Sequence, residues 1–269
     1  MYLGYNTNGF AHHRLDDALT IIAELGYESV AITLDHHVLN PYDANCERES
    51  ERIAGLLRDL KLRCVIETGS RFLLDPWRKH FPTLLSATAA DRERRFDFLS
   101  RASEIARRLN AEAVSFWSGA ADASLSELDA WPMLVDACKR LAANAVRIAF
   151  EPEPGMFIDT MERFDRLHEA VGHPQFGLTL DVGHLHCQGE LPIASHIQRW
   201  RDWLWNVHIE DMRQGVHDHL MFSEGEMDFP PILAALREID YRGGLHVELS
   251  RHSHDAVNTA RRALAFLRG

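Results

Sequence analysis

The chain has 269 residues, of which 46% are hydrophobic and 26% are charged, proportions typical of a globular protein with a sizeable core. Its formal net charge of -11 argues against a general binder of phosphate backbones, which needs clustered Lys and Arg, so we expect no nucleic-acid partner. The four cysteines are scattered, and neither a signal-like N-terminus nor a long apolar stretch is seen. We therefore expect a cytoplasmic protein without a membrane partner.

Strand-like and helix-like segments alternate along the chain. Short apolar runs predict strands over residues 2–6, 29–34, 63–67, 113–117, 146–151, 176–181, 204–208 and 245–248. Apolar residues at helical spacing predict helices over 15–25, 47–60, 91–109, 131–144, 160–171, 193–203, 231–239 and 256–267. The irregular segment 69–90 has the length of a functional lid. Eight strand–helix units in one chain predict an α/β fold, a (β/α)8 TIM barrel forming a single domain over residues 1–269.

Four of the predicted strands end in residues that can bind a metal ion. Glu151, Asp181, His208 and Glu248 close the last four strands, each about one strand–helix unit after the one before. Taken singly, each would ordinarily be a helix cap, a surface charge or a hydrogen-bonded core histidine. In a β/α barrel, however, the strand ends converge on one face, where unpaired carboxylates would repel each other without a cation. The pattern therefore predicts an enzyme with one divalent ion, Mn²⁺ before Mg²⁺, Co²⁺ or Zn²⁺.

The segments around these residues resemble the xylose isomerase-like superfamily. The similarity is carried by EPEPG at 151–155, DVGH at 181–184, HIED at 208–211 and HLMFSEGEMD at 219–228. It points to the branch of sugar phosphate isomerases and epimerases, which is AP endonuclease 2-like. The resemblance implies that Glu151, Asp181, His208 and Glu248 bind the metal and that His184 contacts the substrate.

Three further residues are candidates for substrate contact. Arg213 lies near the position of a substrate-contacting arginine in ketose epimerases, but a solvated loop arginine is an equally good interpretation. Trp117 and Glu67 close the fourth and third predicted strands, on the face that carries the active site in such barrels. We therefore expect a small sugar-like molecule as the partner, and a homo-oligomer is left open.

The predicted function is the isomerisation or epimerisation of a keto-sugar, a sugar phosphate or an inosose. The metal would stabilise an enediolate, while Glu151 and Glu248 remove and return the proton from opposite sides. His184 would orient a hydroxyl or move a proton. One alternative is a dehydratase of a keto-polyol, using the same enolate. An abasic-site endonuclease is disfavoured, because the third and fourth strand ends lack the histidines of a trinuclear zinc site, and a non-catalytic metal-binding barrel is the last alternative.

Overall fold

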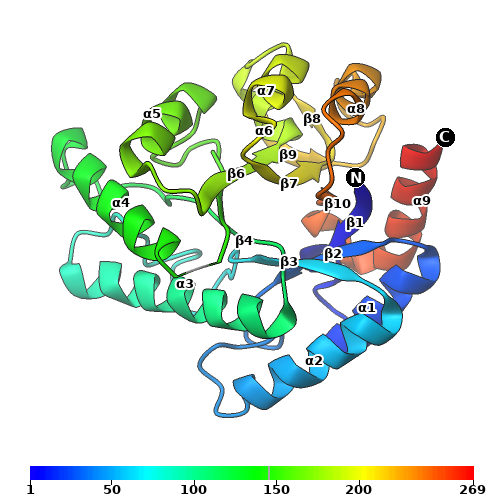
Figure 1. Ribbon diagram of the computed structural model, residues 1–269, viewed down its shortest axis with the longest axis horizontal. Helices are drawn as coiled ribbons and strands as arrows, with labels where there is room; N and C mark the ends of the chain where they lie inside the picture. The colour runs from blue at the N-terminus through cyan, green and yellow to red at the C-terminus, as the bar shows by residue number, and fades with distance from the viewer. Residues whose placement is uncertain (145) are drawn as a thin grey trace.

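In the computed structural model, which describes residues 1–144 and 146–269, eight parallel strands close into a barrel in the order β1-β10-β7-β6-β5-β4-β3-β2 (Figure 1). The strands are β1 Tyr2–Asn6, β2 Ser29–Thr33, β3 Arg63–Glu67, β4 Val114–Phe116, β5 Ile148–Phe150, β6 Phe176–Asp181, β7 Leu204–Ile209 and β10 Gly244–Val247. The closed barrel confirms the (β/α)8 fold predicted from the alternation of elements.

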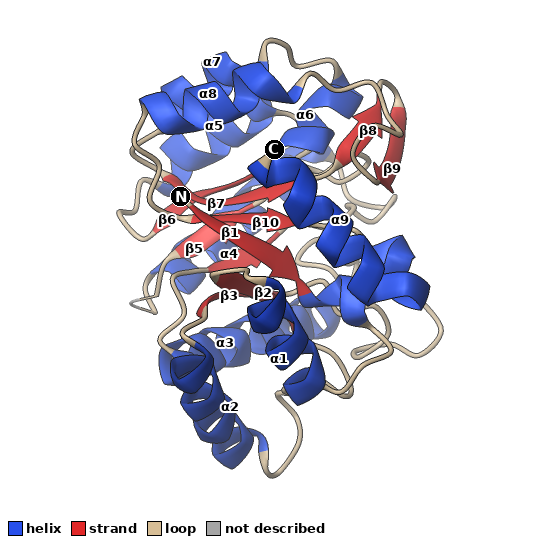
Figure 2. Ribbon diagram, turned by 90° about the vertical axis from the view of Figure 1, so that its right-hand side faces the viewer, coloured by secondary structure: helices blue, strands red, loops and turns tan. Residues whose placement is uncertain are grey.

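Helices connect the strands and cover the outside of the barrel, as Figure 2 shows. They are α1 Leu15–Leu25, α2 Cys46–Leu60, α3 Ala89–Leu109, α4 Glu127–Ala142, α5 Met161–Val171, α7 Ile193–Trp200, α8 Phe229–Glu238 and α9 Ala256–Arg268. Helix α4 begins at Glu127, not at Trp131, because the Ser126 side chain caps it by accepting a hydrogen bond from the Asp129 amide at 3.2 Å. Within the described residues, the helices fall short of the length and apolar character that crossing a membrane requires.

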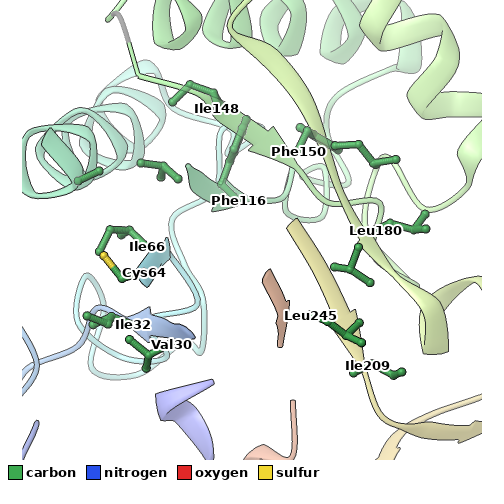
Figure 3. Packing of buried hydrophobic residues seen from close by; sticks show 14 of the residues in the cluster. Val30, Ile32, Cys64, Ile66, Phe116, Ile148, Phe150, Leu180, Ile209 and Leu245 are labelled. Atoms are coloured by element: carbon green, nitrogen blue, oxygen red, sulfur yellow. The ribbon is translucent and has the colours of Figure 1, made fainter. Parts of the chain in front are cut away.

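The strand faces that point away from the barrel axis pack against these helices. Figure 3 shows this layer of buried apolar side chains, which includes Val30, Ile32, Cys64, Ile66, Phe116 and Phe150. Such strands are apolar along their length because both sheet faces are covered. The packed layer holds the strand ends in fixed positions relative to one another, which is what a site built from several strands requires.

The inside of the barrel contains a buried polar layer. His246 on β10 points inward and is fully buried. Two glycines give its ring room, since a Cβ added at Gly4 or Gly244 would lie 2.2 Å from a ring carbon of His246. The ring is therefore enclosed by the backbones of β1 and β10, and its nitrogens need polar partners inside the barrel.

Several short elements beyond the strand ends are absent from the sequence prediction. They are the 3₁₀ helices η1 Thr7–Phe10 and η2 Ser250–Asp255, the helix α6 Val182–Gln188 and the hairpin of β8 Asp211–Arg213 and β9 Val216–Leu220. The hairpin lies beyond one end of the barrel (Figure 2). All of them follow β1, β6, β7 or β10, so they surround the carboxyl ends of the strands.

Candidate active site

The structure brings together the four residues that close the last four strands. One donor atom from each of Glu151, Asp181, His208 and Glu248 lies within 4.8 Å of the other three. The Nδ1 atom of His208 lies 3.0 Å from Glu151 Oε1, 2.9 Å from Glu248 Oε2 and 3.9 Å from Asp181 Oδ2. Glu151, His208 and Glu248 line a cavity of about 250 Å³ that opens at this end of the barrel. We call these four residues the quartet.

The donor set of the quartet fits a divalent cation. Three carboxylates surround one ring nitrogen, which can carry only one proton. Asp181 Oδ2 is buried without a hydrogen-bond partner, although Asp181 Oδ1 accepts from the backbone amide of His184 at 2.8 Å. Asp181 therefore caps helix α6 with one oxygen and directs the other toward Nδ1 of His208, 3.9 Å away. A buried, unpartnered carboxylate oxygen is costly unless a cation approaches it.

Glu67, expected to contact substrate, lines the same cavity as His208 and lies against its ring. Its Oε1 atom is 2.9 Å from His208 Nε2 and accepts a hydrogen bond from Asn206 Nδ2 at 3.0 Å. Carboxylates face Nδ1 as well, so both ring nitrogens can donate in the metal-free protein, in line with the raised pKa of His208. With a metal on Nδ1, the remaining ring proton would reside on Nε2, because the carboxylate of Glu67 can only accept. This arrangement is typical of a metal-ligating histidine held by a carboxylate.

The polar contacts continue from Glu67 through the barrel interior. Asn206 Oδ1 accepts from His246 Nδ1 at 2.7 Å, and Ser29 Oγ lies 2.9 Å from His246 Nε2. Asn206, His246 and Ser29 are fully buried. The sequence carries a signal for two of them, because Asn206 and His246 stand two residues before His208 and Glu248 and share their inward-facing side of the strand. Sequence reasoning missed these three residues.

The pKa values of the quartet residues shift in different directions. Burial raises the pKa of Glu151 well above its ordinary value, against the opposing effect of His208. Burial also favours neutral Glu248, but the charge and hydrogen bond of His208 outweigh it and lower the pKa of Glu248. Burial opposes the charged form of His208, yet Glu67, Glu151 and Glu248 raise its pKa well above the ordinary value. Without a cation, the quartet therefore retains protons that metal binding must displace.

His184 lies between the quartet and the β8–β9 hairpin. Its Nδ1 donates to the Pro152 carbonyl at 3.2 Å, and its Nε2 is 3.5 Å from Asp181 Oδ2 and 3.0 Å from His217 Nε2. Burial lowers the pKa of His184 to about 4, so the ring is neutral near pH 7. The nitrogens of His184, His217 and His219 also lie within 4.8 Å of one another. Helix α6 and the hairpin thus add histidines to the pocket wall.

Of the remaining candidates for substrate contact, Trp117 lines the pocket and Arg213 does not. Trp117 lines the pocket, and its ring meets the His80 ring edge-on at 5.3 Å between centroids. Arg213 is exposed on β8, donates to the Glu224 carbonyl at 2.9 Å and is not among the residues that line the pocket. The structure therefore does not bring Arg213 to the quartet. Asn8, which the sequence analysis did not single out, donates to Glu248 Oε1 at 2.7 Å.

The model of the family described as "Xylose isomerase-like TIM barrel" matches residues 19–269. The chain belongs to this family, which confirms the resemblance carried by the strand-end motifs. Among curated relatives, it is 29% identical over 141 residues to the inosose dehydratase of Lacticaseibacillus casei, a match that covers 45% of this chain and 47% of that protein. The chain therefore spans about half the length of the curated relatives it matches.

Two solved structures share the fold over nearly the whole chain. D-allulose 3-epimerase from Methylomonas sp., solved in complex with D-allulose, has a TM-score of 0.76 at 21% identity and covers 100% of this chain and 96% of its own. The IOLI protein, solved with a zinc atom, has a TM-score of 0.79 at 19% identity, with 99% and 98% covered. At these identities the likeness shows the barrel fold. The relatives so matched include enzymes that act on sugars and inososes.

Proposed function

We propose that the protein is a divalent-metal-dependent isomerase or epimerase of a keto-sugar, a sugar phosphate or an inosose. The observation that carries this proposal is the placement of two glutamates. Glu151 follows β5 and Glu248 follows β10, and each places a carboxylate oxygen within 3.0 Å of His208 Nδ1. Two carboxylates that approach one bound carbon from different strands can remove a proton on one side and return it on the other.

Glu151, Asp181, His208 and Glu248 would hold one divalent ion, for which Mn²⁺ is our first choice. When bound, such an ion supplies Lewis-acid stabilisation to a carbonyl beside the carbon that loses its proton. The fit is supported by the unpartnered Oδ2 atom of Asp181. The zinc atom in the structurally similar IOLI protein agrees with a metal site in this fold.

The surrounding residues would orient the substrate. Asn8 fixes one oxygen of Glu248 by a hydrogen bond of 2.7 Å, which sets the direction of the other oxygen. Neutral His184 faces the pocket and would hold a substrate hydroxyl. Trp117 offers an aromatic face suited to the C–H surface of a sugar. These residues give a polyol polar contacts on one side and an apolar wall on the other.

The proposal is tested by deuterium incorporation from heavy water. The Mn²⁺-loaded protein is incubated with a panel of ketoses and inososes, and the recovered sugars are analysed by mass spectrometry and NMR. We expect one carbon-bound deuterium in at least one sugar, together with its epimer or isomer. An absence of exchange across the panel, with metal bound, would favour a barrel that binds metal without catalysis.

A dehydratase is the second candidate, because the curated relatives matched include several inosose dehydratases. Proton removal beside a carbonyl is common to both reactions, and the outcome depends on whether a hydroxyl on the next carbon leaves. The same incubation separates the two: a product lighter by one water identifies the dehydratase, and a product of unchanged mass apart from deuterium identifies the isomerase or epimerase.

A further inference from the structure

The segment between β3 and α3 forms one wall of the pocket and is rich in positive charge. Residues 69–88 contain Arg71, Arg78 and Lys79 with Asp75 as their acidic residue, in a chain whose net charge is -11. Arg78 pairs with Asp75 at 2.8 Å, so this arginine is neutralised locally. Arg71 and Lys79 both line the pocket, and neither makes an ion pair with any described residue.

His80 brings Arg71 and Lys79 to the same part of the pocket wall. Its backbone amide donates to the Arg71 carbonyl at 2.6 Å, which brings the stretch around Arg71 beside the stretch around Lys79. Lys79, His80 and Trp117 line both the quartet cavity and an adjoining cavity of about 410 Å³. Lys79 therefore lies where the two cavities meet, and Arg71 lies on the quartet side of this junction.

A buried arginine lies against Trp117, which lines both cavities. Arg95 on α3 is 3% exposed and makes no ion pair with a carboxylate of the described residues. It donates to the Thr68 carbonyl at 3.3 Å, and its guanidinium carbon lies 5.3 Å from the centre of the Trp117 ring. Arg95 is therefore a buried cation without an acidic partner, and its charge acts through the low-dielectric interior on neighbouring groups such as His80.

The pKa of the His80 ring is lowered at this site. Burial lowers the pKa of His80 to about 4, and Lys79, Arg95 and Arg71 all act in the same direction. The imidazole is therefore neutral near pH 7 and lies among three cations. An anion placed beside it would gain from all three charges in a partly enclosed site, where charge-assisted hydrogen bonds are stronger than in water.

We propose that the junction around His80 is an anion subsite and that the substrate carries a carboxylate or phosphate group. The group would contact Arg71 and Lys79, at the end of the substrate remote from the quartet. This inference rests on the proposed function, since it names the class of sugar that the same pocket accepts. The cationic wall and the carboxylate-rich quartet also give the substrate one orientation, with its carbonyl end toward the metal ligands.

The test compares three six-carbon probes that differ in charge: D-glucitol, D-gluconate and D-glucitol 6-phosphate. Binding to the Mn²⁺-loaded protein is measured by isothermal titration calorimetry for the wild type and for the double variant Arg71→Gln/Lys79→Gln. The control variant Arg107→Gln/Lys139→Gln removes the same charge from exposed positions on α3 and α4, which do not line the pocket. Circular dichroism confirms that each variant is folded.

We expect at least one anionic probe to bind about tenfold or more tightly than D-glucitol in the wild type and the control. The double variant should lose this preference. Tighter binding of gluconate identifies a carboxylate subsite, and tighter binding of the phosphate ester identifies a phosphate subsite. Equal affinities in the wild type, or no binding of either anion, would overturn the proposal.

If the double variant still binds an anionic probe more tightly than D-glucitol, the anion-subsite proposal is also overturned, because the metal site would then hold the anion. The readout is binding and does not depend on turnover. A preserved charge preference without deuterium exchange would therefore count against the proposed isomerase and leave the anion subsite standing.

Discussion

Glu67 and His208 stand on opposite sides of the barrel, at the end of β3 and on β7, and are joined by a contact of 2.9 Å between Glu67 Oε1 and His208 Nε2. The carboxylate holds the ring so that Nδ1 points to Glu151 and Glu248. Glu67, which we expect to contact substrate, lines the pocket and also lies against a candidate metal ligand. The contact links the metal site to the polar layer inside the barrel.

Removal of this contact should weaken metal binding. We predict that Glu67→Ala lowers the affinity for Mn²⁺ about 10–100-fold, since the loss of a carboxylate behind a histidine ligand has this effect in other sites. Glu67→Gln keeps an acceptor oxygen and should lose less. Titration calorimetry measures both. An unchanged affinity in Glu67→Ala would mean that the contact does not position His208.

Metal binding should release protons. The pKa values of Glu151 and His208 are both raised in the metal-free protein, where burial and the neighbouring carboxylates respectively dominate the two shifts. Metal binding needs ionised Glu151 and a free Nδ1 lone pair on His208, so these protons must leave. The affinity for Mn²⁺ should therefore rise with increasing pH until both groups have lost their protons.

The proton release is measured by titrating Mn²⁺ into the protein in two buffers of different ionisation enthalpy at one pH. We expect the observed binding enthalpies to differ by the number of released protons multiplied by the difference in buffer enthalpy. Equal enthalpies in the two buffers would show that the metal-free quartet carries no displaceable proton.

We predict that replacing Asn206 lowers the stability of the barrel. Its amide donates to Glu67 and accepts from His246 inside the barrel. Asn206→Leu leaves both partners buried without these hydrogen bonds, which we expect to lower the free energy of unfolding by about 2–4 kcal/mol. Urea unfolding measures it. The control is Asn258→Leu on the exposed face of α9, where a change within about 0.5 kcal/mol is expected.

Glu151 and Glu248 should be needed for proton transfer. At saturating Mn²⁺, with occupancy checked by elemental analysis, Glu151→Gln and Glu248→Gln should each lower the rate of substrate deuterium exchange by about 10²–10⁴-fold, the usual contribution of a general acid or base. Glu162→Gln, at an exposed position on α5, is the matched control and should exchange at the wild-type rate. Exchange that persists in both active-site variants would assign proton transfer to another residue.

The barrel could be predicted because the same strand–helix pattern occurs eight times along the sequence. Each strand is an apolar run between amphipathic helices, and eight repetitions reinforce one another even where a single boundary is wrong, as at α4. The convergence of the quartet follows from the same topology, because parallel strands end on one face. That part of the site is encoded in residue type and spacing.

The short elements at the mouth of the barrel were not predictable in the same way. Helix α6 spans seven residues, too few for a periodic pattern, and its N-cap is Asp181, which also belongs to the quartet. Strand β9 reads Val-His-Asp-His-Leu, and its polar centre gives no apolar alternation. His217 and His219 are brought to the pocket by this hairpin.

The charged wall of residues 69–88 could not be predicted for another reason. The segment has no described helix or strand, so no periodicity relates Arg71 to Lys79. The two stretches are joined by His80, whose amide donates to the Arg71 carbonyl and whose Nδ1 lies 3.3 Å from the Ser70 carbonyl. The length of the segment suggested a functional lid, which stays a prediction, and the structure shows that the segment lines the pocket.

The metal centre is tested most directly by counting metal ions. The protein is dialysed to equilibrium against Mn²⁺, and the bound metal per chain is measured by elemental analysis for the wild type, His208→Ala and His217→Ala. We predict one ion per chain in the wild type and in His217→Ala, and a loss of tight binding in His208→Ala. No bound ion in the wild type, or two ions of which His217→Ala removes one, would contradict a single metal held by Glu151, Asp181, His208 and Glu248.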